Sequence, residues 1–140
     1  MNSNVNSSLE LIGEIAAVFG LSTPVRRLSE AAYWEHPYLF LSCPEEFFES
    51  YLGEALANAV LRVGELDLDT VCREIEFFLR PDSIASHMEY HSSRWANMRF
   101  RKAAVIWHWL KFMEQSNSGC WEEGELAVSR DYWRALAGED

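Results

Sequence analysis

The sequence predicts an all-α, single-domain bundle of about five to seven helices around a central apolar helix at about residues 94–115. Apolar residues recur at spacings of three and four through most of the chain, as they do along one face of an α-helix. Capping residues, prolines and glycines fall at the ends of these periodic segments. No segment shows convincingly the alternation of apolar and polar residues that marks a half-buried strand.

Length and composition predict one domain over residues 1–140. A chain of 140 residues, 49% hydrophobic and with six Trp and eight Phe, can bury a core without the help of a disulfide or a metal. No linker, internal repeat or low-complexity segment divides it.

Two helices are predicted in the first quarter of the chain. Ser7 and Glu10 form a capping box ahead of an apolar stripe, and Gly20 suits the position after the helix end. A second helix is predicted to start at Pro24, in the first helical turn, and to end before Pro37.

The next helix has the strongest start signal, with Ser42 as N-cap and Glu45 three residues later. Its predicted core stripe consists of Phe48, Leu52, Ala55, Ala59 and Val63. Its predicted outer face is acidic with small residues in the middle, namely Glu46, Glu49, Ser50, Gly53, Glu54 and Ala57. A further helix is predicted over 68–79, stopped by Pro81.

The last third of the chain predicts a short helix within 82–91, the central helix and a terminal helix capped by Ser129. The central helix is apolar over most of its circumference, as expected for the middle of a bundle. Its narrow polar stripe consists of Asn97, Arg101, His108, Lys111 and Gln115, so His108 is expected to face solvent although a Trp stands on either side of it.

The charge is acidic and unevenly distributed. Twenty-two acids against twelve bases give −10, which disfavours direct nucleic-acid binding and anionic membranes and suits a basic protein partner. Residues 45–76 hold nine acids and two bases, whereas 94–111 hold five bases and no acid. Arg99 and Lys102 lie on the largely apolar arc of the central helix, so they need carboxylate partners or must extend to water.

The three cysteines include no CxxC pair, which predicts reduced thiols. The N-terminal segment has no basic residues before its apolar part, as a secretion signal would have. Together these features predict a cytoplasmic protein.

His87 and His91 stand four residues apart and could share a zinc ion. The zinc-protease motifs place a Glu directly beside one His, whereas Glu89 is two residues from both. No third ligand is marked, so we expect ordinary histidines and no metal. A small metal-dependent hydrolase using this pair is the alternative. The chain has no phosphate-binding or dinucleotide motif, so no cofactor and no catalytic residue are expected.

The segments CPEEFFESYLGEALANAVL, FFLRP, FRKAAVIWHWLKFM and DYWRAL resemble an uncharacterised bacterial family of small all-helical proteins of unknown function. The resemblance covers about residues 38–136, and Gly53 stands where that family has Pro. It implies a helical fold and no catalytic residue.

At the level of protein class, a small acidic domain without catalytic motifs is similar to the immunity proteins that neutralise toxins, many of them basic nucleases. We therefore expect a non-enzymatic inhibitor that docks an acidic helical face on a basic toxin or nuclease, an antitoxin or an inhibitor of a defence system. The predicted partner-binding residues are Glu46, Glu49, Glu54, Asp67 and Asp69, with Tyr51 and Trp34 as aromatic anchors. A structural homo-oligomer, such as a homodimer that buries the surplus Trp, is a further alternative.

Overall fold

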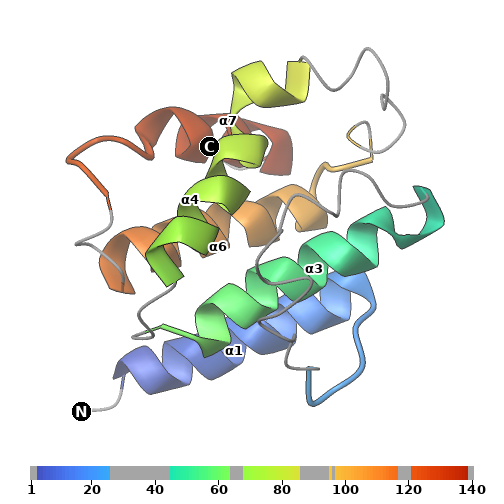
Figure 1. Ribbon diagram of the computed structural model, residues 1–140. Helices are drawn as coiled ribbons and strands as arrows, with labels where there is room; N and C mark the ends of the chain where they lie inside the picture. Colours follow the sequence, from blue (N-terminus) through green and yellow to red (C-terminus); the bar gives the residue numbers. More distant parts are fainter. Residues whose placement is uncertain are drawn as a thin grey trace.

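The computed structural model describes residues 3–25, 45–63, 68–85, 95, 97–116 and 121–138, and these ranges are helical without a strand. The long helices are α1 (Ser3–Phe19), α3 (Glu45–Leu61), α4 (Leu68–Leu79), α6 (Arg101–Ser116) and α7 (Ala127–Ala137) (Figure 1). Residues 81–85 form a short helix after α4. The predicted all-α bundle is confirmed. None of the described helices combines the length and the apolar composition that a membrane span requires.

Helix α6 lies at the centre of the bundle. It packs against α1 on one side and α7 on the other, while α3 packs against α1 and α4 (Figure 1). Its buried residues are Ala103, Val105, Ile106, Trp109, Leu110 and Met113. The indole N–H of Trp109 donates to the carbonyl oxygen of Leu56 on α3 at 3.0 Å. This bond satisfies the one polar atom that the ring brings into the core.

The central helix starts at Arg101 and not at residue 94 as predicted. The backbone N–H of Phe100 donates to the carbonyl oxygen of Leu136 on α7 at 3.0 Å, and Phe100 has a φ of 57°. A positive φ ends the helical path, because a bulky L-residue rarely adopts it. The contact with α7, which lies far away in the sequence, therefore sets the start of α6.

Small residues on α3 form its contact with α1, where an outer face was predicted. Gly53 and Ala57 are both buried. A Cβ atom at Gly53 would lie 2.6 Å from the Cβ of Phe19, so glycine is what permits α1 and α3 to approach this closely. The predicted acidic outer face is consequently confined to the first half of α3. Val63, predicted to lie in the core stripe, is exposed.

The end of α1 agrees with the prediction, since the helix stops at Phe19 and Gly20 follows with a φ of 71°. Its start differs, because the helix begins at Ser3, before the predicted cap at Ser7. Residues 21–25 form a bend, so the second predicted helix does not start at Pro24, and the rest of its predicted range lies outside the described residues. Leu21 and Val25 are partly buried and pack against the core from this bend. Their apolar contacts hold the bend against the bundle.

Helix α7 covers the end of α4. The indole N–H of Trp133 donates to the carbonyl oxygen of Leu79, the last residue of α4, at 2.8 Å. Trp133 thereby satisfies one of the carbonyl groups that a helix end leaves without a partner. Ser129, predicted as the N-cap, lies inside α7 and is buried, and the N-cap residue Leu126 makes no side-chain capping bond.

Candidate functional site

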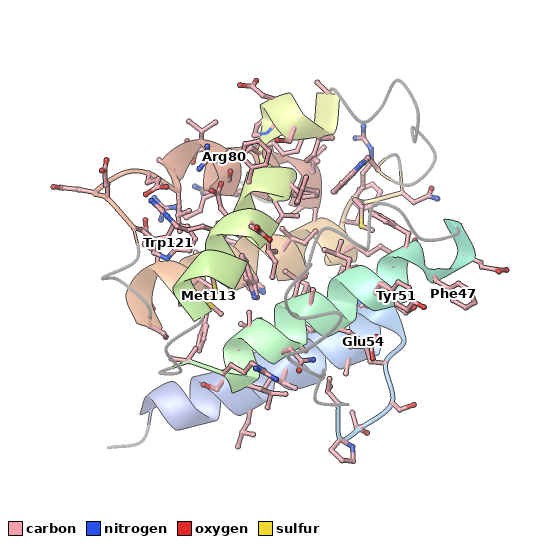
Figure 2. The ribbon with its side chains drawn as sticks, viewed as in Figure 1. Phe47, Tyr51, Glu54, Arg80, Met113 and Trp121 are labelled. Atoms are coloured by element: carbon pink, nitrogen blue, oxygen red, sulfur yellow. The ribbon has the colours of Figure 1, made fainter. Side chains whose placement is uncertain are left out.

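The first half of α3 presents acids around an aromatic pair, of which Phe47 is exposed and Tyr51 is partly buried. We call Glu46, Phe47, Glu49, Ser50, Tyr51 and Glu54 the α3 face. Glu46 is exposed and the Phe47 side chain is 44% exposed. The rings of Phe47 and Tyr51 stack with their centroids 5.8 Å apart and 18° between their planes (Figure 2). A stacked pair at the surface offers a rigid apolar contact area at a low cost in side-chain entropy.

Glu49 belongs to the edge of the α3 face next to α6. Its carboxylate forms an ion pair with the Lys102 ammonium, with 2.7 Å between Oε1 and Nζ. Lys102 was expected to need a carboxylate, and this contact supplies it. Part of the acidity predicted for partner binding is therefore neutralised within the fold, and Glu46 carries the exposed negative charge on this turn.

Glu54 lies at a hollow of about 350 Å³ beside the aromatic pair. The bend after α1 and one side of α3 form its walls, which are Gly20, Leu21, Ser22, Pro24, Val25, Ser50 and Glu54. No base lines this hollow among the described residues. The walls of the hollow are otherwise small or apolar.

The structure does not describe the side chains of the other predicted site residues. Trp34, Asp67, His87 and His91 lie outside the described residues, as does the side chain of Asp69. The predicted roles of these residues, and the metal-dependent hydrolase that rests on the two histidines, stay predictions. Within the described ranges, no three His, Cys, Asp or Glu side chains are placed to share a metal ion.

A second group of charged side chains joins α4 to α7. Glu76 is completely buried, and its carboxylate accepts two hydrogen bonds from Arg80 Nε and one from Nη2, at 2.7–2.9 Å. The hydroxyl of Ser129 donates to the same carboxylate at 2.9 Å. A buried carboxylate is stable only with such a full set of partners. These hydrogen bonds, with the negative charges of Glu76 and Glu125, raise the pKa of Arg80 against the opposing effect of its burial.

The network continues toward the turn before α7. The Glu125 carboxylate accepts from Arg73 at 3.0 Å and lies 3.6 Å from Arg80. Its other oxygen accepts the backbone N–H of Glu122 at 2.9 Å. The Arg73 guanidinium also lies 5.6 Å from the ring centroid of Trp121, within cation–π range.

A cavity of about 440 Å³ opens beside this network, and we call it the α4–α7 cavity. It is lined by Arg73, Arg80, Pro81, Asp82, Glu122, Glu125, Val128 and Ser129. Arg80 lies far from Phe47 in Figure 2, so the cavity is separate from the α3 face. The Ser129 hydroxyl is buried and donates to a carboxylate, and the described residues place no base to activate it, so its geometry is not that of a nucleophile.

The predicted polar stripe of α6 meets α1. His108 is partly exposed, and its Nδ1 lies 2.6 Å from a carboxylate oxygen of Glu14. Glu10, Lys111 and Gln115 line the shallow hollow around this pair. His108 therefore joins two helices at the surface, as the solvent-facing prediction allows.

The sequence analysis missed the roles of four residues. Phe47 had a signal, since two consecutive Phe residues stand about 100° apart on a helix and only one of them can face the core. The Glu76–Arg80 pair also had a sequence signal, because opposite charges four residues apart lie on the same face of a helix. Ser129 had none, because its partner lies 53 residues away.

No protein-family model, curated protein or solved structure matches this chain. The resemblance to an uncharacterised family of helical proteins accordingly stays a prediction.

Proposed function

We propose that this protein is a non-enzymatic binding protein that docks its α3 face on a basic protein, in the manner of an immunity protein that inhibits a basic toxin or nuclease. The observation that carries the proposal is the exposed Phe47 ring, stacked on the partly buried Tyr51, beside the exposed carboxylate of Glu46. Aromatic anchors with charged neighbours are typical of protein interfaces.

The charge of the chain supports a basic partner. The net charge of −10 attracts a cationic surface over a distance, and this attraction increases the association rate. Phe47 and the apolar walls of the hollow beside Glu54 supply the contact area that charge alone lacks. Together they suit a partner surface that carries Arg or Lys around an apolar centre.

The test begins with capture of the partner by the tagged protein in low salt, its identification, and titration with the purified partner. Glu46→Lys should weaken binding by at least about 10-fold, and Phe47→Ala by a similar factor, since central anchors cost more than about 1 kcal/mol. Glu46 is a cleaner probe than Glu49, because removing Glu49 also breaks the ion pair with Lys102.

The matched control is Asp131→Lys, which makes the same charge change at an exposed position on α7. It should weaken binding by less than about 3-fold, through the long-range field alone. Equal weakening by Glu46→Lys and Asp131→Lys, or no weakening by Phe47→Ala, would reject the α3 face as the docking surface. Circular dichroism of each variant shows whether the fold is retained.

A further inference from the structure

The α4–α7 cavity contains more negative charge than its own arginines neutralise. Of the residues that line it, Glu125 pairs with Arg73, and Arg80 pairs with Glu76, which is fully buried and does not line the cavity. Asp82 and Glu122 also line it, are exposed, and make no ion pair with a described residue. Because the charges of both arginines are already balanced by Glu125 and Glu76, the two carboxylates of Asp82 and Glu122 leave an excess of two negative charges. Such a cavity attracts a cation and repels a simple anion.

The cavity also keeps a hydrogen-bond donor at its wall. Arg80 uses Nε and Nη2 to hold Glu76, and its Nη1 donates to no described residue. Its side chain is 41% exposed, so this nitrogen is accessible. A guanidinium held rigidly on one edge is preorganised to bind a carboxylate with the other.

Apolar surface separates these polar groups. Pro81 and Val128 line the cavity, and Val128 is 68% exposed, unusual for a residue of its kind. The volume of about 440 Å³ falls within the range of about 300–1,000 Å³ that small-molecule sites occupy. A ligand of this site therefore needs a cationic group, an acceptor and a short aliphatic stem between them.

We propose that the α4–α7 cavity binds a free basic amino acid, arginine or lysine. Its side-chain cation pairs with Asp82 and Glu122, its α-carboxylate accepts from Arg80, and its methylene groups pack against Val128. The net positive charge of such a ligand offsets the excess negative charge of the cavity, which a neutral amino acid does not. This site is independent of the α3 face and of the proposed function.

The test is isothermal titration calorimetry of the full chain at low ionic strength with four probes: L-arginine, L-lysine, butylguanidine and L-glutamate. L-Arginine or L-lysine should bind saturably at one site per chain, with a Kd below about 1 mM. Butylguanidine has the guanidinium, the aliphatic stem and the net charge of L-arginine without the carboxylate, and it should bind at least about 10-fold more weakly, the usual loss of a charge-assisted hydrogen bond. L-Glutamate should give no saturable heat.

Two neighbouring variants locate the site. Glu122→Gln should weaken L-arginine binding by about 2–5-fold, the contribution of an exposed ion pair, whereas Glu123→Gln should leave it unchanged. Both residues are exposed, but only Glu122 lines the cavity. The proposal is overturned by an absence of saturable binding for both basic amino acids, by butylguanidine binding as tightly as L-arginine, or by equal effects of the two variants.

Discussion

The same methyl group, added to two glycines of this bundle, should change stability in opposite directions. Gly13 lies inside α1 and Gly53 inside α3. Alanine is favoured over glycine inside a helix by about 1 kcal/mol. At Gly13 a Cβ atom would meet nothing within 4 Å. We therefore expect Gly13→Ala to raise the free energy of unfolding by about 0.5–1 kcal/mol.

Gly53→Ala has the same helix-forming gain and a larger steric cost. Its Cβ would lie 2.6 Å from the Cβ and 3.0 Å from the Cγ of Phe19, whereas carbon atoms in contact prefer about 3.5–4.0 Å. The Cβ of Phe19 is attached directly to the α1 backbone, so no change of rotamer relieves the overlap and α1 must move by about 1 Å. Overpacking of this kind costs about 1–3 kcal/mol, so the net result is a loss of up to about 2 kcal/mol.

Urea unfolding followed by far-UV circular dichroism measures both variants against the parent chain. Thermal unfolding should separate their midpoints in the same order, by about 4 °C per kcal/mol at this chain length. The difference between the variants isolates the α1–α3 contact, because the gain in helix propensity is common to both. If Gly53→Ala stabilised the protein as much as Gly13→Ala, the close approach of Phe19 to α3 would be refuted.

Three further predictions concern α4 and α7. Arg80→Gln should lower the free energy of unfolding by about 2–3 kcal/mol. Breaking a fully buried pair costs about 3–5 kcal/mol, and the loss is smaller here because solvent reaches Arg80. Glu76→Gln leaves no buried charge and should therefore cost less than Arg80→Gln, and the reverse order of the two variants in urea unfolding would contradict the network. Trp133→Phe should lower the free energy of unfolding by about 2–3 kcal/mol in the same assay, because it leaves a cavity and an unpaired carbonyl at Leu79. A loss below about 1 kcal/mol would show that this hydrogen bond does not cap α4. Burial raises the pKa of Tyr132 despite the opposing charge of Arg99. Above about pH 10 the folded state therefore keeps a proton that the unfolded state loses. The stability of the folded state should accordingly fall as the pH rises through about 10. Tyr132→Phe should make that decline shallower between about pH 9.5 and about pH 11, and an identical slope would exclude this contribution.

Helix identity could be predicted where the signals are local. Helix α4 spans Leu68–Leu79 as expected, because Pro81 and the preceding acids mark its ends within a few residues. The core of α6 and the need of Lys102 for a carboxylate also followed from periodicity, since both depend on which face of one helix is apolar. Such features need no knowledge of the partner helices.

Features that depend on the partner helices could not be predicted in this way. The small residues on α3 are compatible with an exposed face and with a close helix contact, and only the approach of Phe19 decides between them. In the same way Ser129 suits a helix cap by local propensity, and its burial beside Glu76 requires the docking of α7 on α4.

The sequence by itself determined that this protein is a helical bundle with an acidic first half of α3 and an apolar central helix. The tertiary structure decided which acids stay exposed: Glu46 does, while Glu49 pairs with Lys102 and Glu76 is buried with Arg80. The physical reason is that charge is a property of each residue, whereas its neutralisation requires a second residue brought within a few ångströms by the packing of helices far apart in the chain.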